Sequence, residues 1–352
     1  MKMTTILGAG LSGLVTAINL AKEGYNVDVY EKNTDVGMRF HGDLQGLENW
    51  SEKRDFLDEL KEINIETNFD CDPFLKVIIT NCSKSKEIKS SRPLFYLVKR
   101  GSFSGTIDYG LKKQALKFGV NLHFQKTLCS SEADIVASGP NPKEVVGFVK
   151  GITFRTNIKD TAIVAFNDKL AFKGYSYLLV TKGYGCLCVV VRLDEVSQIS
   201  EYFEKTKEFF VEKFNLDTRS PKEVGGFGSF SLGNFRKGKT LYVGESAGLQ
   251  DFLWGFGIRF AIKSGYLAAR SVIGNKDYEE IAKEYFGNRL KAGVVNRYLW
   301  KNILSKKDYL IFIELAEILK KKLYSIHKYS PLLKMIYPIA LADSKKTYPE
   351  LT

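Results

Sequence analysis

The sequence has few of the residues that build disulfide frameworks and metal sites. Its 352 residues include 5 cysteines and 3 histidines. The cysteines are odd in number and form no C-x-x-C pair, and the histidines lie far apart, at His41, His123 and His327. We therefore predict no disulfide framework and no metal site, and the cysteine usage favours a reducing compartment.

Long apolar runs are also missing. The sequence has no run of about 18 apolar residues, the length that a transmembrane helix needs. Met1 leads almost directly into a strand-like segment, without the charged and apolar parts of a secretory signal. We therefore expect a cytoplasmic protein.

Acidic residues are outnumbered, with 40 Asp and Glu against 52 Lys and Arg, which gives a formal net charge of +12. This balance favours anionic partners such as phosphorylated cofactors or acidic lipid. No basic motif interleaved with aromatic residues is present, so we predict no nucleic-acid partner. The length suits two packed domains or one large one.

The strongest pattern lies in the first forty residues. Residues 4–7 and 27–30 are short apolar runs, and helical spacing occupies most of the segment between them. Gly8, Gly10 and Gly13 follow the first run in the spacing G-x-G-x-x-G, and the second run ends at Glu31. A strand, glycine turn, helix, second strand and acid in this order predict a dinucleotide-binding unit.

The glycines and the helix start have separate expected roles. Gly8 permits a tight turn, Gly10 lets the backbone approach a pyrophosphate, and Gly13 lets the helix pack on the strand. The helix N-terminus, with Leu11 and Ser12, is expected to present free N–H groups and a partial positive charge to the phosphates.

The acid and the loop after it are expected to hold other parts of the nucleotide. Glu31, followed by Lys32, lies where a carboxylate accepts hydrogen bonds from the adenosine ribose, which also disfavours NADP. Arg39, in the next loop, is expected to neutralise the pyrophosphate, and the alternative is a solvated arginine. The fingerprint alone does not choose between FAD and NAD.

A second glycine-rich stretch occurs near residue 250. Gly244 and Glu245 follow a strand-like run, and Gly255, Gly257 and Ile258 open a predicted helix. A carboxylate and glycines between a strand end and a helix start suit close approach to a polar ligand. The alternative is an ordinary strand–helix connection.

Between these stretches the sequence predicts further sheet structure. Residues 74–79 and 94–98 are expected as strands of a second sheet, with an exposed turn at 83–91 between them. Residues 121–125 and 133–140 are expected to return to the first sheet, the second segment ending in a glycine turn. The nucleotide-binding domain is thus predicted to be interrupted by an insertion.

The second half of the chain is first β-rich and then helical. Residues 150–195 predict an antiparallel sheet with a substrate pocket, and residues 225–228 predict a loop. Cys186 and Cys188, two apart in a strand-like run, are expected on one face of this sheet. The basic segments 309–323 and 329–341 predict amphipathic helices, which either cover the core or lie on an anionic membrane.

With both glycine-rich stretches, the chain resembles the FAD-dependent oxidoreductases built like para-hydroxybenzoate hydroxylase, and within them the geranylgeranyl reductase family. The N-terminal fingerprint is similar to the family's site for the ADP half of FAD. The second stretch is similar to its G-D-A-A-G…P…G-E-G-I motif, which holds the ribityl chain and pyrophosphate. Glu245 stands in place of the motif's Asp, and Phe252 stands in place of its Pro.

Two further segments carry the resemblance. Residues 100–111 are similar to the family's R-x-x-F/L-D-x-x-L region, which adds Arg100 to the expected cofactor site. Residues 175–179 look like its Y-x-W-x-F-P strand, which lines the lipid pocket. The resemblance therefore implies that Tyr175 and Tyr177 contact the substrate.

The implied fold is α/β, with a Rossmann-like FAD-binding domain (a parallel sheet with helices), an antiparallel-sheet substrate domain and a helical C-terminus. The expected segments are listed by domain: 1–65, 98–150 and 235–275 bind FAD, 66–97 and 151–234 form the substrate domain, and 276–352 form the helical C-terminal region.

The implied activity is the reduction of C=C bonds in an isoprenoid (geranylgeranyl) lipid chain by hydride transfer from reduced flavin. The electron donor, NAD(P)H or ferredoxin, is left open. His41 and Asp43 are weak candidates for catalysis because their loop could approach the flavin ring, and a solvent-facing role is the alternative. The expected partners are an apolar small molecule and, through the basic helices, the inner face of an anionic membrane.

Two other functions fit the same sequence. The first is a flavin monooxygenase that acts on a small aromatic substrate with NAD(P)H and O₂. Ser138-Gly139 replaces the Asp-Gly pair that those hydroxylases use for nicotinamide binding, which counts against it. The second is a protein that binds FAD without catalysis.

Overall fold

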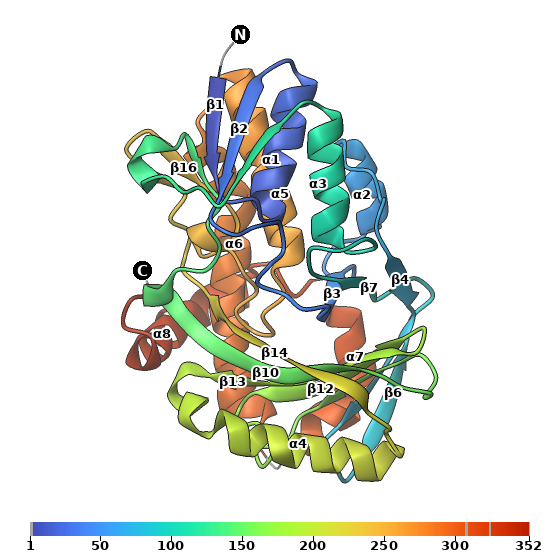
Figure 1. Ribbon diagram of the computed structural model, residues 1–352. Helices are drawn as coiled ribbons and strands as arrows, with labels where there is room; N and C mark the ends of the chain where they lie inside the picture. Colours follow the sequence, from blue (N-terminus) through green and yellow to red (C-terminus); the bar gives the residue numbers. More distant parts are fainter. Residues whose placement is uncertain (1–2, 307–308, 324, 352) are drawn as a thin grey trace.

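The computed structural model describes residues 3–306, 309–323 and 325–351. Two large sheets lie at opposite ends of the molecule (Figure 1), with β1 and β2 at the top and β10, β12, β13 and β14 below. Helices cover the outer sides, and the C-terminal helices run beside both sheets. Among the described residues, no helix has the length and apolar character needed to cross a membrane.

Six strands form the first sheet. In order they are β15 (Arg236–Lys237), β16 (Thr240–Tyr242), β9 (Ile135–Val136), β1 (Met3–Leu7), β2 (Asn26–Glu31) and β8 (Asn121–Phe124). All neighbours are parallel except β15 and β16. Their carboxyl ends meet at one edge, which is where ligands bind in such sheets. Strands β8 and β9 confirm the prediction that residues 121–125 and 133–140 return to this sheet.

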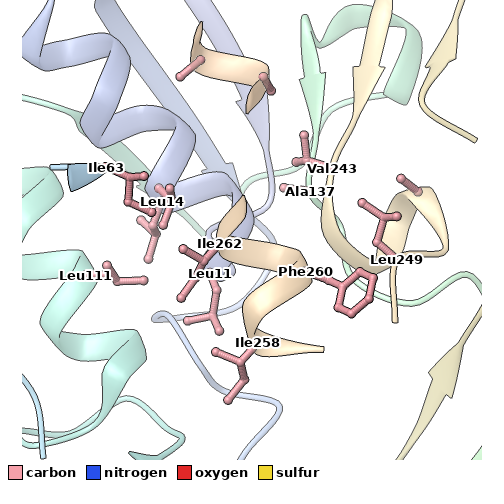
Figure 2. Close-up of a cluster of buried hydrophobic side chains, with 14 of the residues drawn as sticks. Leu11, Leu14, Ile63, Leu111, Ala137, Val243, Leu249, Ile258, Phe260 and Ile262 are labelled. Carbon is pink, nitrogen blue, oxygen red and sulfur yellow. The ribbon is translucent and has the colours of Figure 1, made fainter. Parts of the chain in front are cut away.

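Close helix packing positions this edge. The packed helices are α1 (Leu11–Lys22), α3 (Ile107–Lys117) and α5 (Ile258–Gly274). Leu11 and Leu14 of α1 pack beside Ile262 of α5 (Figure 2). A Cβ on Gly265 would lie 2.3 Å from the Ser12 carbonyl oxygen, and the Thr16 hydroxyl donates to the Gly265 carbonyl at 3.0 Å. Glycine is therefore required where α1 and α5 touch.

Seven strands form the second sheet. In order they are β14 (Arg219–Ser229), β10 (Val145–Arg155), β13 (Tyr184–Arg192), β12 (Tyr175–Thr181), β11 (Thr161–Ala165), β5 (Lys76–Thr80) and β6 (Ser85–Lys89). All neighbours are antiparallel except β11 and β5. Helix α4 (Ile199–Phe214) covers the outer face (Figure 1). Cys186 and Cys188 share the other face, with 3.5 Å between their Sγ atoms, as predicted.

The remaining elements connect the two sheets. A third sheet contains β3 (Leu44–Glu48), β7 (Phe95–Lys99) and β4 (Cys71–Phe74), beside α2 (Phe56–Glu62). Helix α6 (Tyr278–Leu299) continues into a π-helical turn at Trp300–Leu304, and α7 (Leu310–Leu323) and α8 (Pro331–Thr347) follow. Helix α8 packs against α6.

Three local predictions are wrong. Residues 94–98 belong to the third sheet, through β7, and not to the second. Within residues 83–91 the chain forms β6, an edge strand in which Ile88 is buried and Lys89 is exposed, and an exposed lysine protects a sheet edge. Residues 225–228 are not a loop but part of β14, paired with β10. In each case the local composition did not determine which sheet or turn the segment forms, and pairing with a strand distant in the sequence did.

Candidate functional site

A cavity of about 1330 Å³ extends from the carboxyl edge of the first sheet to the C-terminal helices. A single ligand pocket usually has about 300–1,000 Å³. The volume therefore suits two ligands at once. The lining is polar beside the glycine fingerprint and apolar beyond it.

The three fingerprint glycines have different surroundings. A Cβ on Gly8, whose φ is +103°, would lie 2.3 Å from the Ala137 carbonyl oxygen, and a Cβ on Gly13 would lie 2.1 Å from that of Gly8. A Cβ on Gly10 would meet only the Ala137 oxygen, at 3.9 Å, among the described residues. Gly8 and Gly13 are thus needed for the turn itself, whereas Gly10 leaves space inside the cavity.

The two glycine-rich stretches meet at this point. A Cβ on Gly244 would lie 2.6 Å from Ser12 Oγ, so the second stretch abuts the first turn of α1. Glycine is the N-cap of both helices, Gly10 for α1 and Gly257 for α5, and it supplies no capping side chain. Both N-termini line the cavity with their partial positive charge.

Glu31 ends β2 at the rim of the cavity, beside Lys32. Its Oε2 accepts the Ala9 backbone N–H at 3.0 Å, and its Oε1 accepts the backbone N–H of Asn33 at 3.0 Å. These bonds, with a further one from the Asn33 side-chain amide to Oε1 at 2.7 Å, fix the carboxylate at the strand end and leave accepting capacity on Oε2 for a ligand. The position fits the predicted contact with a ribose.

Arg39 and Glu245 form an ion pair, although they are far apart in the sequence. Arg39 Nη1 lies 3.0 Å from Glu245 Oε2, and the guanidinium also donates to the Phe227 carbonyl of β14. Both side chains line the cavity. The structure therefore brings together two predicted cofactor residues and connects them to the second sheet.

Arg100 lines the cavity but has its charge satisfied within the protein. Its Nε and Nη2 lie 2.8 Å from the two carboxylate oxygens of Asp108, and Nη1 donates to Gln45 at 3.0 Å. Arg100 is 8% exposed and Asp108 1%. This geometry favours a role in holding the cavity wall.

Gly255, Gly257 and Ile258 form the wall at the start of α5. Gly255 has φ +75°, and its carbonyl accepts the Gln250 side-chain amide at 2.9 Å. Of the predicted residues of the second stretch, Glu245, Gly255, Gly257 and Ile258 line the cavity, whereas Gly244 is buried behind it against Ser12.

Of His41 and Asp43, only Asp43 has its side chain at the cavity. Asp43 lines the cavity, and burial raises the pKa of its carboxyl above the usual range. The His41 backbone N–H donates to Asp43 at 2.8 Å, but the His41 side chain is exposed and lies outside the lining formed by the described residues. Of the two catalytic candidates, the geometry supports Asp43.

Tyr175 and Tyr177 of β12 both line the cavity. The Tyr175 hydroxyl donates to the Trp254 carbonyl. Burial, with a smaller effect of Cys188, raises the pKa of Tyr177 well above its ordinary value, so this phenol stays protonated. Their position fits the predicted contact with substrate.

The sequence reasoning missed an aromatic wall. All three tryptophans line the cavity, and the ring of Trp50 lies 4.6 Å from that of Phe256 and 6.3 Å from that of Trp254, centroid to centroid. Trp254 lies 6.4 Å from Trp300. The signal available was the rarity of tryptophan, at 3 in 352 residues, with one of them inside the second glycine-rich stretch.

Comparisons with known proteins support the fold. Residues 6–44 match the family described as NAD(P)-binding Rossmann-like domain. A 1-hydroxycarotenoid 3,4-desaturase from Flavobacterium sp. (strain P99-3) is 46% identical over 41 residues, which cover 12% of this chain and 8% of that protein. This sequence match therefore covers a small part of either protein.

Solved structures match over nearly the whole chain. A geranylgeranyl bacteriochlorophyll reductase-like protein from Thermoplasma acidophilum has a TM-score of 0.70 at 16% identity, covering 99% of this chain and 98% of its own. The flavin-dependent brominase Bmp2 has a TM-score of 0.63 at 15% identity, with coverages of 97% and 98%. A flavoprotein/dehydrogenase from Cytophaga hutchinsonii has 0.61 at 14%, with coverages of 97% and 99%.

The chain has a flavoprotein fold. The predicted fold class, a Rossmann-like domain with an antiparallel-sheet domain and a helical C-terminus, is confirmed. At these sequence identities the similarity establishes the architecture, and the reaction has to be inferred from the residues of the site.

The polar half of the cavity fits FAD. Two helix N-termini and the Arg39 guanidinium supply donors for a pyrophosphate, and Gly10 leaves the space that it needs. Glu31 suits the ribose. The predicted residues that line this half and would hold FAD are Gly8, Gly10, Leu11, Ser12, Glu31, Lys32, Arg39, Glu245, Gly255, Gly257 and Ile258. Gly13 and Gly244 lie behind the lining and permit the close packing at the start of α1.

His327, in the connection between α7 and α8, joins the C-terminal helices to β3. Its Nε2 lies 3.8 Å from Glu48 Oε1, and both side chains are buried. Burial acts to lower the pKa of His327, but the charges of Glu48 and Asp251 outweigh it and raise the pKa above 6.5. Burial acts to raise the pKa of Glu48, but His327 and Arg259 outweigh it and lower the pKa below 4.5.

We therefore expect stability to depend on pH through this pair. The contribution of His327 is complete below pH 6.5 and is lost as pH rises through its raised folded-state pKa. The contribution of Glu48 is complete above pH 4.5 and is lost as pH falls. The thermal midpoint should thus fall as pH rises above 6.5, and His327→Gln should flatten this slope. An unchanged slope in the variant would contradict the assignment.

Proposed function

We propose that the protein is an FAD-dependent reductase of C=C bonds in an isoprenoid lipid chain, of the geranylgeranyl type. The observation that carries the proposal is the continuity of the cavity. Its polar half suits a dinucleotide, and the same cavity continues as an apolar space along α7 to the protein surface. The electron donor is proposed to be NAD(P)H or ferredoxin, and the site of action the cytoplasmic face of a membrane.

The apolar half has the character of a site for a long hydrocarbon. Its walls come from β5, β6, β11, β12, α7 and the aromatic wall. They include Val77, Ile79, Ile88, Leu94, Phe95, Val164, Phe166, Leu179, Leu253, Phe312 and Leu323. Such a lining stabilises an apolar chain by removing it from water, and it offers few polar groups to orient a small polar substrate.

When bound, FAD supplies hydride chemistry to this site. The chain's own residues hold the alkene and exclude water. The rings of Trp50, Trp254 and Phe256 form an apolar wall, and Tyr175 and Tyr177 border it on β12. Asp43, whose carboxyl pKa is raised by burial, and the protonated phenol of Tyr177 are the groups placed to hold a proton there.

The test uses the full chain, purified with its flavin. Under anaerobic conditions, the dithionite-reduced protein is mixed with a geranylgeranyl lipid, and the product is analysed by mass spectrometry. We expect the lipid to gain one hydrogen molecule per saturated double bond. An unchanged lipid mass, with flavin bound and reducible, would contradict the reductase proposal.

The length of the apolar half of the cavity should determine how long an isoprenoid chain the protein can reduce. Ala316 of α7 is buried and lines the apolar half. Ala316→Trp should fill this part, so we expect reduction of a geranylgeranyl chain to fall by about tenfold or more, since a filled pocket excludes the chain's end. Reduction of a shorter isoprenoid should persist. Leu116→Trp, at an exposed position of α3, is the control. Equal losses for both chain lengths would contradict this use of the cavity.

A flavin monooxygenase acting on a small aromatic substrate is the second candidate. A 2-methyl-3-hydroxypyridine-5-carboxylic acid oxygenase has the same fold, with a TM-score of 0.58 at 14% identity over 88% of this chain and 95% of its own. The aromatic wall could also hold a ring. Substrate-dependent oxygen consumption with NAD(P)H would favour this candidate, whereas a bound flavin that dithionite cannot reduce would indicate FAD binding without catalysis.

A further inference from the structure

We propose that one face of α8 docks the protein on an anionic lipid bilayer, beside the opening of the cavity. The proposal rests on the proposed function only for the nature of the cargo, a lipid chain. The docking surface consists of Leu332, Met335 and Ile339, together with the flanking lysines Lys328, Lys334, Lys345 and Lys346.

The apolar part of this surface is one face of a helix. Leu332, Met335 and Ile339 are 64%, 77% and 61% exposed, and Met335 is the most exposed of the large hydrophobic side chains in the described part of the chain. Their spacing of three and four residues places them on the same side of α8. Ala340 and Ser344, on another side, are buried in the helix's contact with the rest of the protein. The exposed row is therefore not needed for packing of the protein itself.

The charge around this row fits an anionic surface. Lys328, Lys334, Lys345 and Lys346 are all exposed. The single acid of α8, Asp343, pairs with Lys301 of the π-helical turn at 2.9 Å between Nζ and Oδ2. An exposed apolar helix face with lysines beside it binds anionic bilayers in two ways. Its apolar side chains are buried among the lipids, and its lysines are attracted to the anionic headgroups. A second copy of the chain would instead bring two rows of lysines together.

The position of α8 explains what docking would achieve. Lys328 and Ser330, both exposed, line the cavity together with Leu333 in the first turn of α8. The cavity therefore reaches the surface at the start of this helix. A lipid chain could pass from the bilayer into the apolar half of the cavity without crossing water, which removes the cost of exposing its hydrocarbon.

Docking requires no rearrangement of α8. The helix packs along α6, and Tyr348 and Leu351, just after it, are buried in the main core. Its N-terminus is capped by Ser330, whose hydroxyl accepts the Leu333 backbone N–H at 3.4 Å, and Pro331 occupies the first turn. The exposed face is thus held in place in the described structure.

The test is co-sedimentation of the full flavin-loaded chain with vesicles that contain no isoprenoid. Saturated phosphatidylglycerol–phosphatidylcholine vesicles are compared with pure phosphatidylcholine vesicles. We expect binding to the anionic vesicles and much weaker binding to the neutral ones. Met335→Gln/Ile339→Gln should weaken binding by about tenfold or more per substitution, because burying one such side chain contributes about that factor.

A matched substitution controls for the loss of an exposed apolar group. Leu116 is 51% exposed on α3, in the FAD-binding domain. Leu116→Gln should leave vesicle binding unchanged. The thermal midpoint and flavin content of all variants should match those of the parent, since the substituted side chains are exposed.

Three outcomes would overturn the docking proposal. These are no binding to anionic vesicles, equal binding by the parent and the double variant, or a parent dimer in gel filtration that the double variant dissociates. Reduction of a detergent-dispersed geranylgeranyl lipid separates the two proposals. If it occurs without vesicle binding, docking alone fails, and if vesicle binding occurs without reduction, the proposed function alone fails.

Discussion

Replacing Gly10 with valine should give a folded protein that purifies without flavin. A Cβ at Gly10 would approach only the Ala137 carbonyl oxygen, at 3.9 Å, among the described residues, and the backbone angles there, φ −77° and ψ 179°, suit any residue. The added side chain would instead fill the space where the pyrophosphate must approach the start of α1. We therefore expect loss of essentially all bound FAD with little loss of stability.

The measurement is the visible absorbance of the purified variant together with its thermal midpoint. Gly287→Ala in α6, where a Cβ meets nothing within 4 Å among the described residues, is the matched glycine control and should retain flavin. Gly13→Val should behave differently and fail to fold, because its Cβ would lie 2.1 Å from the Gly8 carbonyl oxygen. A folded Gly10→Val protein with stoichiometric FAD would contradict the assignment of the fingerprint.

Replacing Asp108 with alanine should cause a large loss in the free energy of unfolding. It would leave Arg100 buried and without its two carboxylate contacts, both at 2.8 Å. Removing one partner of a buried ion pair costs about 3–5 kcal/mol. The Gly101 backbone N–H, which donates to Asp108 at 3.1 Å, would lose its acceptor as well.

The loss is measured as the shift of the urea unfolding midpoint. Arg100→Met/Asp108→Leu removes both charges and should recover much of the loss. Glu201→Ala breaks the exposed pair of Glu201 with Lys205 on α4 and should change stability by less than about 1 kcal/mol. If Asp108→Ala unfolds no more easily than Glu201→Ala, the ion pair does not support the cavity wall.

The dinucleotide site could be predicted from the sequence because its signal is local. Gly8, Gly10, Gly13 and Glu31 lie within one strand–helix–strand unit, where spacing alone determines which groups reach the sheet edge. The resemblance to flavoprotein oxidoreductases then gave the fold class, which the solved structures confirm.

The parts that could not be predicted depend on contacts between distant segments. Arg39 meets Glu245 across 206 residues, and the three tryptophans come from the segment after β3, the second glycine-rich stretch and the π-helical turn. Neither hydrophobic periodicity nor the residue types of turns indicates which distant segments will be in contact. Arg100 lines the cavity, and its ion pair with Asp108, eight residues later, is a further contact that the sequence did not indicate.

One measurement tests the central claim most directly. The flavin-loaded protein is reduced with dithionite without oxygen, and a geranylgeranyl lipid is added while the visible spectrum is recorded. The proposed function predicts that the oxidised flavin band returns with this lipid and not with buffer or with the fully saturated lipid. A band that returns only when oxygen is admitted would contradict it and favour a monooxygenase.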